Sequence, residues 1–159
     1  MTAARYVIDR RDAIYTVLCE GLATGLAVHA AVPMARIVVC FTAGNLVKVA
    51  EEYEPQGWVA VAADNDHATE RRLGKNPGLE AGRRAAEILG CGVFYPEGIE
   101  GTDWADWRME QVARRKALNA CGRFTTDRML IKQVDGQLAH RLAGKAVYVR
   151  GRKVAAGAR

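Results

Sequence analysis

The chain has 159 residues, of which 50% are hydrophobic and 26% are charged, a composition typical of a folded domain and unlike that of a disordered chain. Its length fits one α/β domain followed by a tail. The longest apolar run, residues 37–43, is shorter than the ~20 residues that a membrane helix needs, and the N-terminus lacks the apolar core of a signal peptide. We therefore expect a cytoplasmic protein with no membrane partner.

The net charge of +5 conceals an uneven distribution of charge along the chain. Residues 1–107 hold 10 Lys and Arg against 15 Asp and Glu, whereas residues 108–159 hold 13 against 3. The sequence therefore predicts an acidic domain at 1–107 and a basic, largely helical C-terminal extension at 108–159. A basic segment favours nucleic acid as a partner, and a solvated helix face with a frayed end is the alternative interpretation.

Strand-like and helix-like segments alternate through the first two thirds of the chain, a pattern typical of a parallel sheet covered by helices. Four apolar, partly β-branched runs are predicted to be strands: 13–19, 37–41, 58–62 and 92–95. Three segments with helical spacing of apolar residues are predicted to be helices: 22–31, 46–53 and 77–89. We therefore predict an α/β fold with a Rossmann-like, mainly parallel four-stranded sheet and helices on both faces.

The remaining segments are predicted from their polarity and turn residues. Residues 64–75, after the third strand, are polar throughout and are predicted to be an exposed loop. Residues 96–102 are rich in turn residues and precede a predicted helix at 103–120. Helix formers at 126–142 and an apolar run at 146–149 predict a last helix and a short strand.

Acidic side chains follow three of the four predicted strands. Glu20 comes directly after the first strand, Asp64 and Asp66 follow the third, and Asp103 and Asp106 follow the fourth. Because ligands of open parallel sheets gather beyond the carboxyl ends of the strands, Glu20 would meet the third-strand acids if the two strands are neighbours. In extended chain, Asp64 and Asp66 would point the same way. An Asp-Asn-Asp sequence by itself also suits a turn or a helix cap.

Three carboxylates gathered in one place would repel each other without a cation, so Glu20, Asp64 and Asp66 are the candidate metal ligands. Mg²⁺ or Mn²⁺ is the expected counter-charge, because both prefer oxygen ligands. Two such ions ~4 Å apart can clamp the attacking and leaving oxygens of a phosphoryl transfer. The chain has no Walker-type phosphate loop, and its four cysteines lack CxxC spacing. The sequence therefore favours metal-dependent phosphate chemistry. It supports neither ATP hydrolysis at a phosphate loop nor a zinc ribbon.

Two clusters of cations are candidate phosphate contacts, each with a solvated surface as the alternative. The first lies in the predicted loop beside the acids and is a candidate for binding nucleotide phosphates: Arg71, Arg72 and Lys75. The second lies on the predicted helix 103–120 and is a candidate for binding nucleic acid: Arg114, Arg115 and Lys116.

Four further residues near the acidic motifs have two interpretations each. Trp104 and Trp107 are placed to stack on a base or to pack against the sheet, and packing is favoured for at least one of them. His67 is a candidate phosphate or metal-water contact, with a solvated loop histidine favoured. Lys48 is a candidate phosphate contact, with an exposed helix position favoured.

Five short motifs occur in an order that resembles a Toprim domain. They are Glu20-Gly21-Leu22-Ala23-Thr24, Phe41-Thr42-Ala43-Gly44-Asn45-Leu46, Ala63-Asp64-Asn65-Asp66, Asn76-Pro77-Gly78 and Gly101-Thr102-Asp103-Trp104-Ala105-Asp106. The resemblance covers residues 13–107 and is closest to the Toprim region of plasmid- and phage-encoded DNA primases and primase-helicases. It implies a compact α/β domain with Glu20 as a general acid or base.

The same resemblance implies the metal ligands and shows two departures. Asp64 and Asp66 would hold the metal, with Asp103 as a further acidic ligand near it. Thr24 stands where bacterial replicative primases often have an aspartate, so the resemblance does not establish a ligand for one of the family's metal positions. Primases of this family generally carry a zinc-binding segment and a second catalytic subdomain before the glutamate, and only 19 residues precede Glu20 here.

The resemblance therefore predicts Mg-dependent nucleotidyl transfer in the DNA replication of a plasmid or phage, with single-stranded DNA template and nucleotides as partners. The chain would be a fragment of a longer primase, a stand-alone Toprim protein, or one subunit of a split enzyme that works with a zinc-binding primase segment or a helicase. Two alternatives stay open: a Toprim-type metal-dependent nuclease, and a non-catalytic module that binds nucleic acid or protein.

Overall fold

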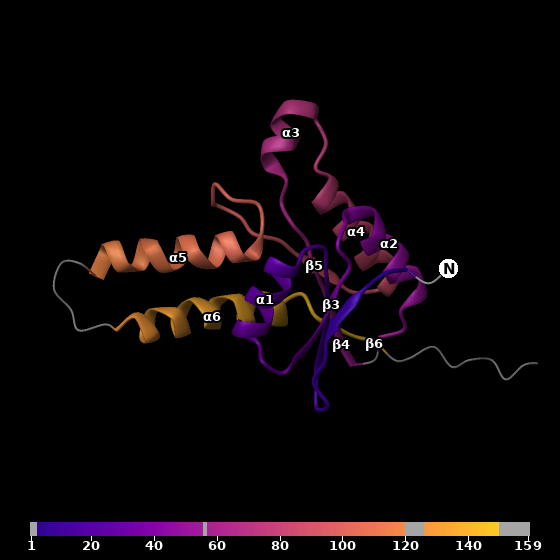
Figure 1. The fold of residues 1–159 in the computed structure, drawn as a ribbon, viewed down its shortest axis with the longest axis horizontal. Helices are drawn as coiled ribbons and strands as arrows, with labels where there is room; N and C mark the ends of the chain where they lie inside the picture. The colour runs from indigo at the N-terminus through magenta and orange to yellow at the C-terminus, as the bar shows by residue number, and fades with distance from the viewer. Residues whose placement is uncertain (1–2, 56, 120–125, 150–159) are drawn as a thin grey trace, which may run out of the picture.

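The structure is a computed structural model that describes residues 3–55, 57–119 and 126–149 (Figure 1). Its six strands are β1 (Tyr6–Ile8), β2 (Tyr15–Cys19), β3 (Ala35–Val39), β4 (Gly57–Ala62), β5 (Gly92–Phe94) and β6 (Val147–Val149). Its six helices are α1 (Leu22–Ala31), α2 (Ala43–Glu52), α3 (His67–Leu73), α4 (Pro77–Leu89), α5 (Trp104–Asn119) and α6 (Asp127–Ala143). In these ranges, no helix is both long enough and apolar enough to cross a membrane.

The four predicted strands form the parallel centre of the sheet. Strands β3, β2, β4 and β5 are neighbours in that order, with Cys19 opposite both Val39 and Ala62, and Ala62 opposite Phe94. Their carboxyl ends therefore lie along one edge. The α/β architecture with a parallel core is confirmed.

The predicted number of four strands in the sheet is wrong, because two further strands pair with the parallel four. Strand β1 pairs antiparallel with β3, and β6 pairs antiparallel with the first half of β4, beside the segment that pairs with β5. The short strand predicted at 146–149 is confirmed as β6, but the sequence did not place it in the sheet. Strand β1 has only three residues, too few for an alternating pattern to be recognised in the sequence.

Alternation along the strands divides the core into two layers. Val17, Ile37 and Ala60 face α1, α5 and α6, whereas Leu18 and Val38 face α2 and α4. Figure 1 shows these helices in two groups, one on each face of the sheet. The prediction of helices on both faces is confirmed.

The predicted loop at 64–75 contains a helix. Helix α3 occupies His67–Leu73 and ends at Gly74, which has a left-handed conformation. None of its residues is buried, and Figure 1 shows it standing away from the sheet. Because it packs no apolar face, it has none of the periodicity that marks a helix in a sequence, although the predicted exposure is confirmed.

The segment after residue 107 shares the core of the preceding residues. Helix α5 runs across residue 107, and α6 buries Val134, Leu138 and Leu142 against the same face of the sheet as Trp104 and Trp107. Strand β6 then joins the sheet. The position 120, the segment 121–125 with Cys121, and the basic stretch 150–159 lie outside the described residues.

Candidate acidic active site

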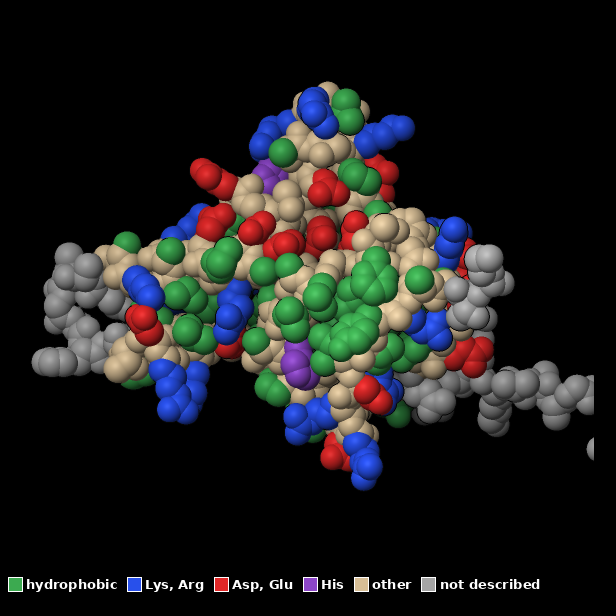
Figure 2. All heavy atoms as spheres, in the orientation of Figure 1, with side chains coloured by type: hydrophobic (Ala, Val, Ile, Leu, Met, Phe, Trp, Pro, Cys, Tyr) green, Lys and Arg blue, Asp and Glu red, His purple; other side chains and the backbone are tan. Residues whose placement is uncertain are grey.

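The candidate site lies at the edge where the parallel strands end. Glu20 follows β2 directly, and Asp64 follows β4 after one intervening residue. Strands β2 and β4 are hydrogen-bonded neighbours, so the condition for their acids to meet is fulfilled. Figure 2 shows a row of acidic side chains across this edge, at the foot of the projection formed by α3.

Asp64 is held by Thr24 of α1. The Thr24 hydroxyl donates to Asp64 Oδ1 at 2.8 Å and accepts from the backbone N–H of Trp104 at 3.3 Å. The pKa of Asp64 is raised to about 7, chiefly by burial; the Thr24 hydrogen bond lowers it, and the charges of Glu20, Asp103 and Asp66 add to the rise. Four carboxylates are therefore close enough to interact electrostatically.

Glu20 is half-buried and is held by the start of α2. Burial raises the pKa of its carboxyl, the charge of Asp66 adds to the rise, and a hydrogen bond from the backbone N–H of Ala43 opposes it. A carboxyl with a raised pKa exchanges protons closer to neutral pH than an ordinary glutamate does.

Asp66 points towards α4 instead of lying parallel to Asp64. The backbone turns at Asp66 to enter α3, and its Oδ2 accepts from the N–H of Gly78 at 2.9 Å. The expectation that Asp64 and Asp66 point the same way is therefore wrong, because the chain is not extended here. A Cβ at position 78 would lie 2.9 Å from the Asp64 carbonyl oxygen and from Asp66 Oδ2, so only glycine lets α4 approach this closely.

Two asparagines tie the acidic loop to its neighbours, and sequence reasoning assigned them no part in the site. Asn76, which is buried, accepts from the N–H groups of Asp66 and Leu79 and donates to Asn65 Oδ1 and Glu70 Oε2. Asn65 also donates to the carbonyl of Pro96 at 2.8 Å. In the sequence Asn76 was noted only as part of the Asn76-Pro77-Gly78 motif and as the cap of the helix that follows, because its other partners are brought to it by the fold.

The third acidic motif caps α5 and also approaches the site. Asp103 Oδ1 accepts from the N–H of Asp106 at 2.8 Å, and Asp106 Oδ2 accepts from the N–H of Thr102 at 3.0 Å. Asp103 contributes to the raised pKa of Asp64, which places it near the other carboxylates. Asp106 is engaged with the loop before α5.

The two predicted cation clusters differ in their surroundings. Arg71, Arg72 and Lys75 are exposed on and just after α3, and the described part of the chain contains no ion pair with any of them. The second cluster is engaged on the helical hairpin of α5 and α6: Arg114 with Gly98 and Glu110, Arg115 with Gln133, and Lys116 with Asp127. Figure 2 shows basic side chains around the α3 projection above the acidic row.

The two tryptophans pack in the core. Trp104 is 0% exposed and Trp107 is 3% exposed, and their rings lie against each other and beneath the guanidinium of Arg141. The base-stacking interpretation is wrong for both, because neither ring has a free face at the surface. His67 Nδ1 lies 3.0 Å from the carbonyl oxygen of Asn65. Lys48 is exposed on α2, as favoured.

The chemical type of the side chains in the site suits a divalent cation. Glu20, Asp64, Asp66 and Asp103 supply hard oxygen ligands, and repulsion by neighbouring carboxylates adds to the burial that raises the pKa of Glu20 and of Asp64. Within residues 3–55, 57–119 and 126–149, however, no three His, Cys, Asp or Glu side chains are grouped as ligands of an ion would be. One oxygen of each aspartate is instead engaged by a hydrogen bond to Thr24, Gly78 or Asp106.

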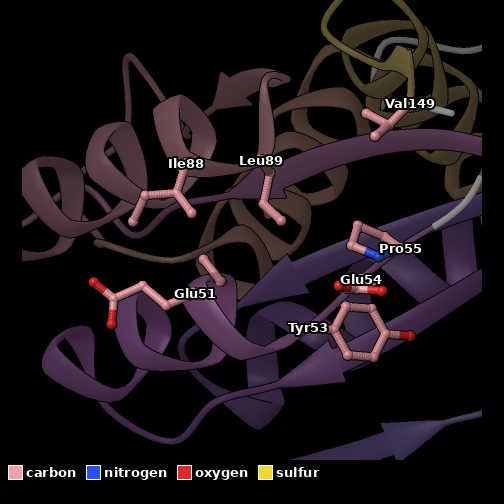
Figure 3. Close-up of a pocket in the computed structure, with 8 residues that line it drawn as sticks. Glu51, Tyr53, Glu54, Pro55, Ile88, Leu89 and Val149 are labelled. Carbon is pink, nitrogen blue, oxygen red and sulfur yellow. The ribbon is translucent and has the colours of Figure 1, made fainter. Parts of the chain in front are cut away.

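A small cavity of about 60 Å³ lies at the other end of the sheet (Figure 3). Ile88 and Leu89 of α4 lie on one side of it, with Glu51 and Tyr53 from the end of α2 on the other. It is at the amino-terminal edge of the parallel strands, near Val149 of β6, and is separate from the acidic row.

One of three comparisons with known proteins finds a match. The family described as the Toprim domain matches residues 15–113 of the chain. No curated protein and no solved structure matches it. The matched residues include the four parallel strands, α3 and all four carboxylates of the candidate site.

Proposed function

The chain belongs to the Toprim family, and from this premise we propose that it performs metal-dependent nucleotidyl transfer of the DNA primase type, in the replication of a plasmid or phage. Toprim domains occur in primases and nucleases and generally bind divalent metal ions. The observation that supports the proposal is the convergence of Glu20, Asp64, Asp66 and Asp103 at one edge, with the pKa of Asp64 raised to about 7.

In this proposal, Asp64 and Asp66 hold Mg²⁺ or Mn²⁺, with Glu20 and Asp103 completing the acidic surroundings. The bound ion would polarise the phosphoryl group and neutralise its developing charge. Thr24 and Gly78 fix the directions of the two aspartates through their hydrogen bonds. Such fixed positions reduce the reorganisation needed when a substrate arrives.

Glu20 is the proposed general base. Its half-buried carboxylate, steadied by the Ala43 N–H, would accept the proton of the attacking 3′-hydroxyl. Burial and the charge of Asp66 raise its pKa, which makes it a stronger base than a solvated glutamate. Proton acceptance and charge stabilisation are thus assigned to different residues.

Substrate phosphates would be bound by the exposed cations on and just after α3: Arg71, Arg72 and Lys75. Figure 2 shows basic side chains around the α3 projection, above the acidic row. Arg114, Arg115 and Lys116 remain proposed nucleic-acid contacts, although each would have to exchange a partner on the hairpin for a phosphate. We propose single-stranded DNA template and nucleotides as the substrates, with a zinc-binding primase segment or a helicase as partner.

The test compares Glu20→Gln with the parent protein on a single-stranded DNA template with ribonucleotides and Mg²⁺ or Mn²⁺, with and without added zinc-binding primase segment. Lengthened products that fall by ~10²- to 10⁴-fold in the variant would support the proposal, because one positioned proton-transfer group is lost. Lys48→Gln, an exposed change on α2, is the control and should keep full activity. Shortened DNA would indicate a nuclease instead, and equal activity of Glu20→Gln and parent would remove Glu20 from the mechanism.

A further inference from the structure

Phe41, two residues beyond the end of β3, has an unfavourable backbone conformation and an unfavourable exposure. Its φ of 69° makes it the one non-glycine residue with a positive φ in the described ranges, a strained conformation for a bulky side chain. Its side chain is also 54% exposed, so the strain is not offset by burial of the ring. A strained and exposed phenylalanine contributes little to the stability of the fold, which points to a role in function.

The Phe41 conformation is held by the residues around it. Its N–H donates to the carbonyl of Glu20 at 2.7 Å, and the carbonyl of Cys40 accepts from the Asn45 side chain at 2.6 Å. On the other side, the Thr42 side chain accepts from the Asn45 N–H and caps α2. The backbone is therefore fixed on both sides of the strained residue.

The turn that displays Phe41 is the same turn that holds Glu20. Two residues after Phe41, the N–H of Ala43 bonds to the Glu20 carboxylate. The ring and the proposed general base are thus placed by one rigid segment at one edge of the sheet.

The surface next to the acidic row is apolar. Leu22 and Leu26 of α1 and Tyr6 of β1 are large hydrophobic residues that remain exposed. Figure 2 shows hydrophobic side chains gathered over α1 and β1, below the row of acids. A nucleic acid bound with a phosphate at the acids would have such a surface available to its bases.

We propose that Phe41 stacks on a nucleobase of the nucleic acid whose phosphate is handled at Glu20, so that the turn after β3 is a base platform as well as a support for the carboxylate. This inference rests on the proposed function. Aromatic rings stack on every base through its π-face, so the contact would position the strand without selecting its sequence. Phe41 would then act as a substrate-binding residue beside the catalytic group.

Equilibrium binding of a fluorescent single-stranded DNA oligonucleotide, with Mn²⁺ present, tests this proposal. Phe41→Gly and Phe41→Leu should each weaken binding by ~5- to 150-fold, because the aromatic face is lost, whereas Phe41→Tyr should stay within about threefold of the parent. Phe41→Gly should also leave the melting temperature unchanged or raise it, because glycine accepts a positive φ. Ile14→Ala, at an exposed position just before β2 and therefore at the opposite edge of the sheet, is the matched control and should bind like the parent.

Oligonucleotides with a single abasic position, moved along the strand, identify the stacked base. The parent should bind the oligonucleotide more weakly when the abasic site is at one particular position. Phe41→Gly should bind that oligonucleotide as well as it binds the intact strand. Equal affinity of Phe41→Gly and parent, or a drop in melting temperature that accompanies the loss of binding, would overturn the inference. Suppose that the double variant Asp64→Asn, Asp66→Asn loses Mn²⁺ binding and turnover while Phe41→Gly binds the oligonucleotide as the parent does. That result would overturn the stacking role of Phe41 and leave the proposed function standing. A parent protein that binds neither the oligonucleotide nor Mn²⁺ would overturn both proposals.

Discussion

At the scale of single residues, the site depends on short polar side chains that orient the carboxylates. The buried Thr24 hydroxyl joins Asp64 to the first turn of α5, and the buried Asn76 joins the loop of Asp66 to α4. The Thr24 bond fixes one oxygen of Asp64, and the N–H of Gly78 fixes one oxygen of Asp66. Burial and the neighbouring charges raise the pKa of Asp64. The metal-free site is therefore well ordered but electrostatically unfavourable when fully ionised.

The stability of the metal-free protein should depend on pH through Asp64. The folded protein holds this proton up to about pH 7, whereas the unfolded chain releases it near the ordinary pKa of 3.8. The stabilisation is complete below the unfolded pKa and is lost as the pH rises through the folded one. We expect the melting temperature to fall between about pH 4 and about pH 7, by roughly 2–4 °C for each kcal/mol lost.

Thermal melts across this pH range, in the presence of a chelator, provide the measurement. Asp64→Asn should flatten the dependence, and saturating Mn²⁺ should restore stability to the parent at the alkaline end. A variant that melts with the same pH dependence as the parent would show that another group is responsible.

At the scale of elements, the helices differ in how they use their cations. Helix α3 buries nothing and carries its cations into solvent, whereas α5 uses Arg115 and Lys116 to reach Gln133 and Asp127 of α6. A cation that already has a partner must break that contact to bind a phosphate, which reduces its net contribution. Position in the fold therefore separates two clusters that look equivalent in the sequence.

We expect α3 to contribute more to the salt dependence of nucleic-acid binding than α5. Replacing Arg71, Arg72 and Lys75 together by Gln should flatten the slope of log K against log salt by about two units, since each phosphate contact on a single strand contributes about 0.7. The matched variant, with Gln at positions 114–116, should change the slope less. Filter binding across a salt series measures both, and the opposite ranking would place the main phosphate contacts on α5.

At the scale of the whole molecule, α5 and α6 are part of the structure that supports the site. Both pack against α1, whose Thr24 holds Asp64, and the two helices are joined by a bidentate pair between Arg108 and Asp135. Leu138 of α6 is completely buried in the core layer that contains Trp104. A substitution that destabilises this core layer should therefore also disturb the carboxylates at the acidic edge.

Leu138→Ala should destabilise the entire chain by ~2–5 kcal/mol, as expected for a large-to-small change in a core. Met129→Ala, on the exposed side of the same helix, should cost about 0.5 kcal/mol or less. Urea unfolding followed by tryptophan fluorescence should show one transition, because Trp104 and Trp107 lie in this layer. If a second transition appears, and Leu138→Ala leaves the unfolding of the residues before 107 unchanged, the C-terminal extension is independent.

The sequence by itself determined the parallel centre of the fold and the composition of the site. Runs such as 58–62 predict buried strands through their own residues, and Asn76-Pro77 and Gly90 predict the bounds of α4 through local caps. The placement of acids after the strands follows from the same local patterns. These features could be predicted because each depends on residues that are adjacent in the chain.

Only the tertiary structure decided strand β1, the place of β6 in the sheet, the exposed helix and the directions of the site residues. Strands β1 and β6 pair with partners distant in the chain, and Asp66 turns to α4 because the N–H of Gly78 is there. Trp104 is buried because α6 lies over the same face of the sheet, and Phe41 is strained because Glu20 and Asn45 hold its turn from both sides. Contacts between residues far apart in the chain leave no periodic trace in it, so their geometry could be seen only once the chain was folded.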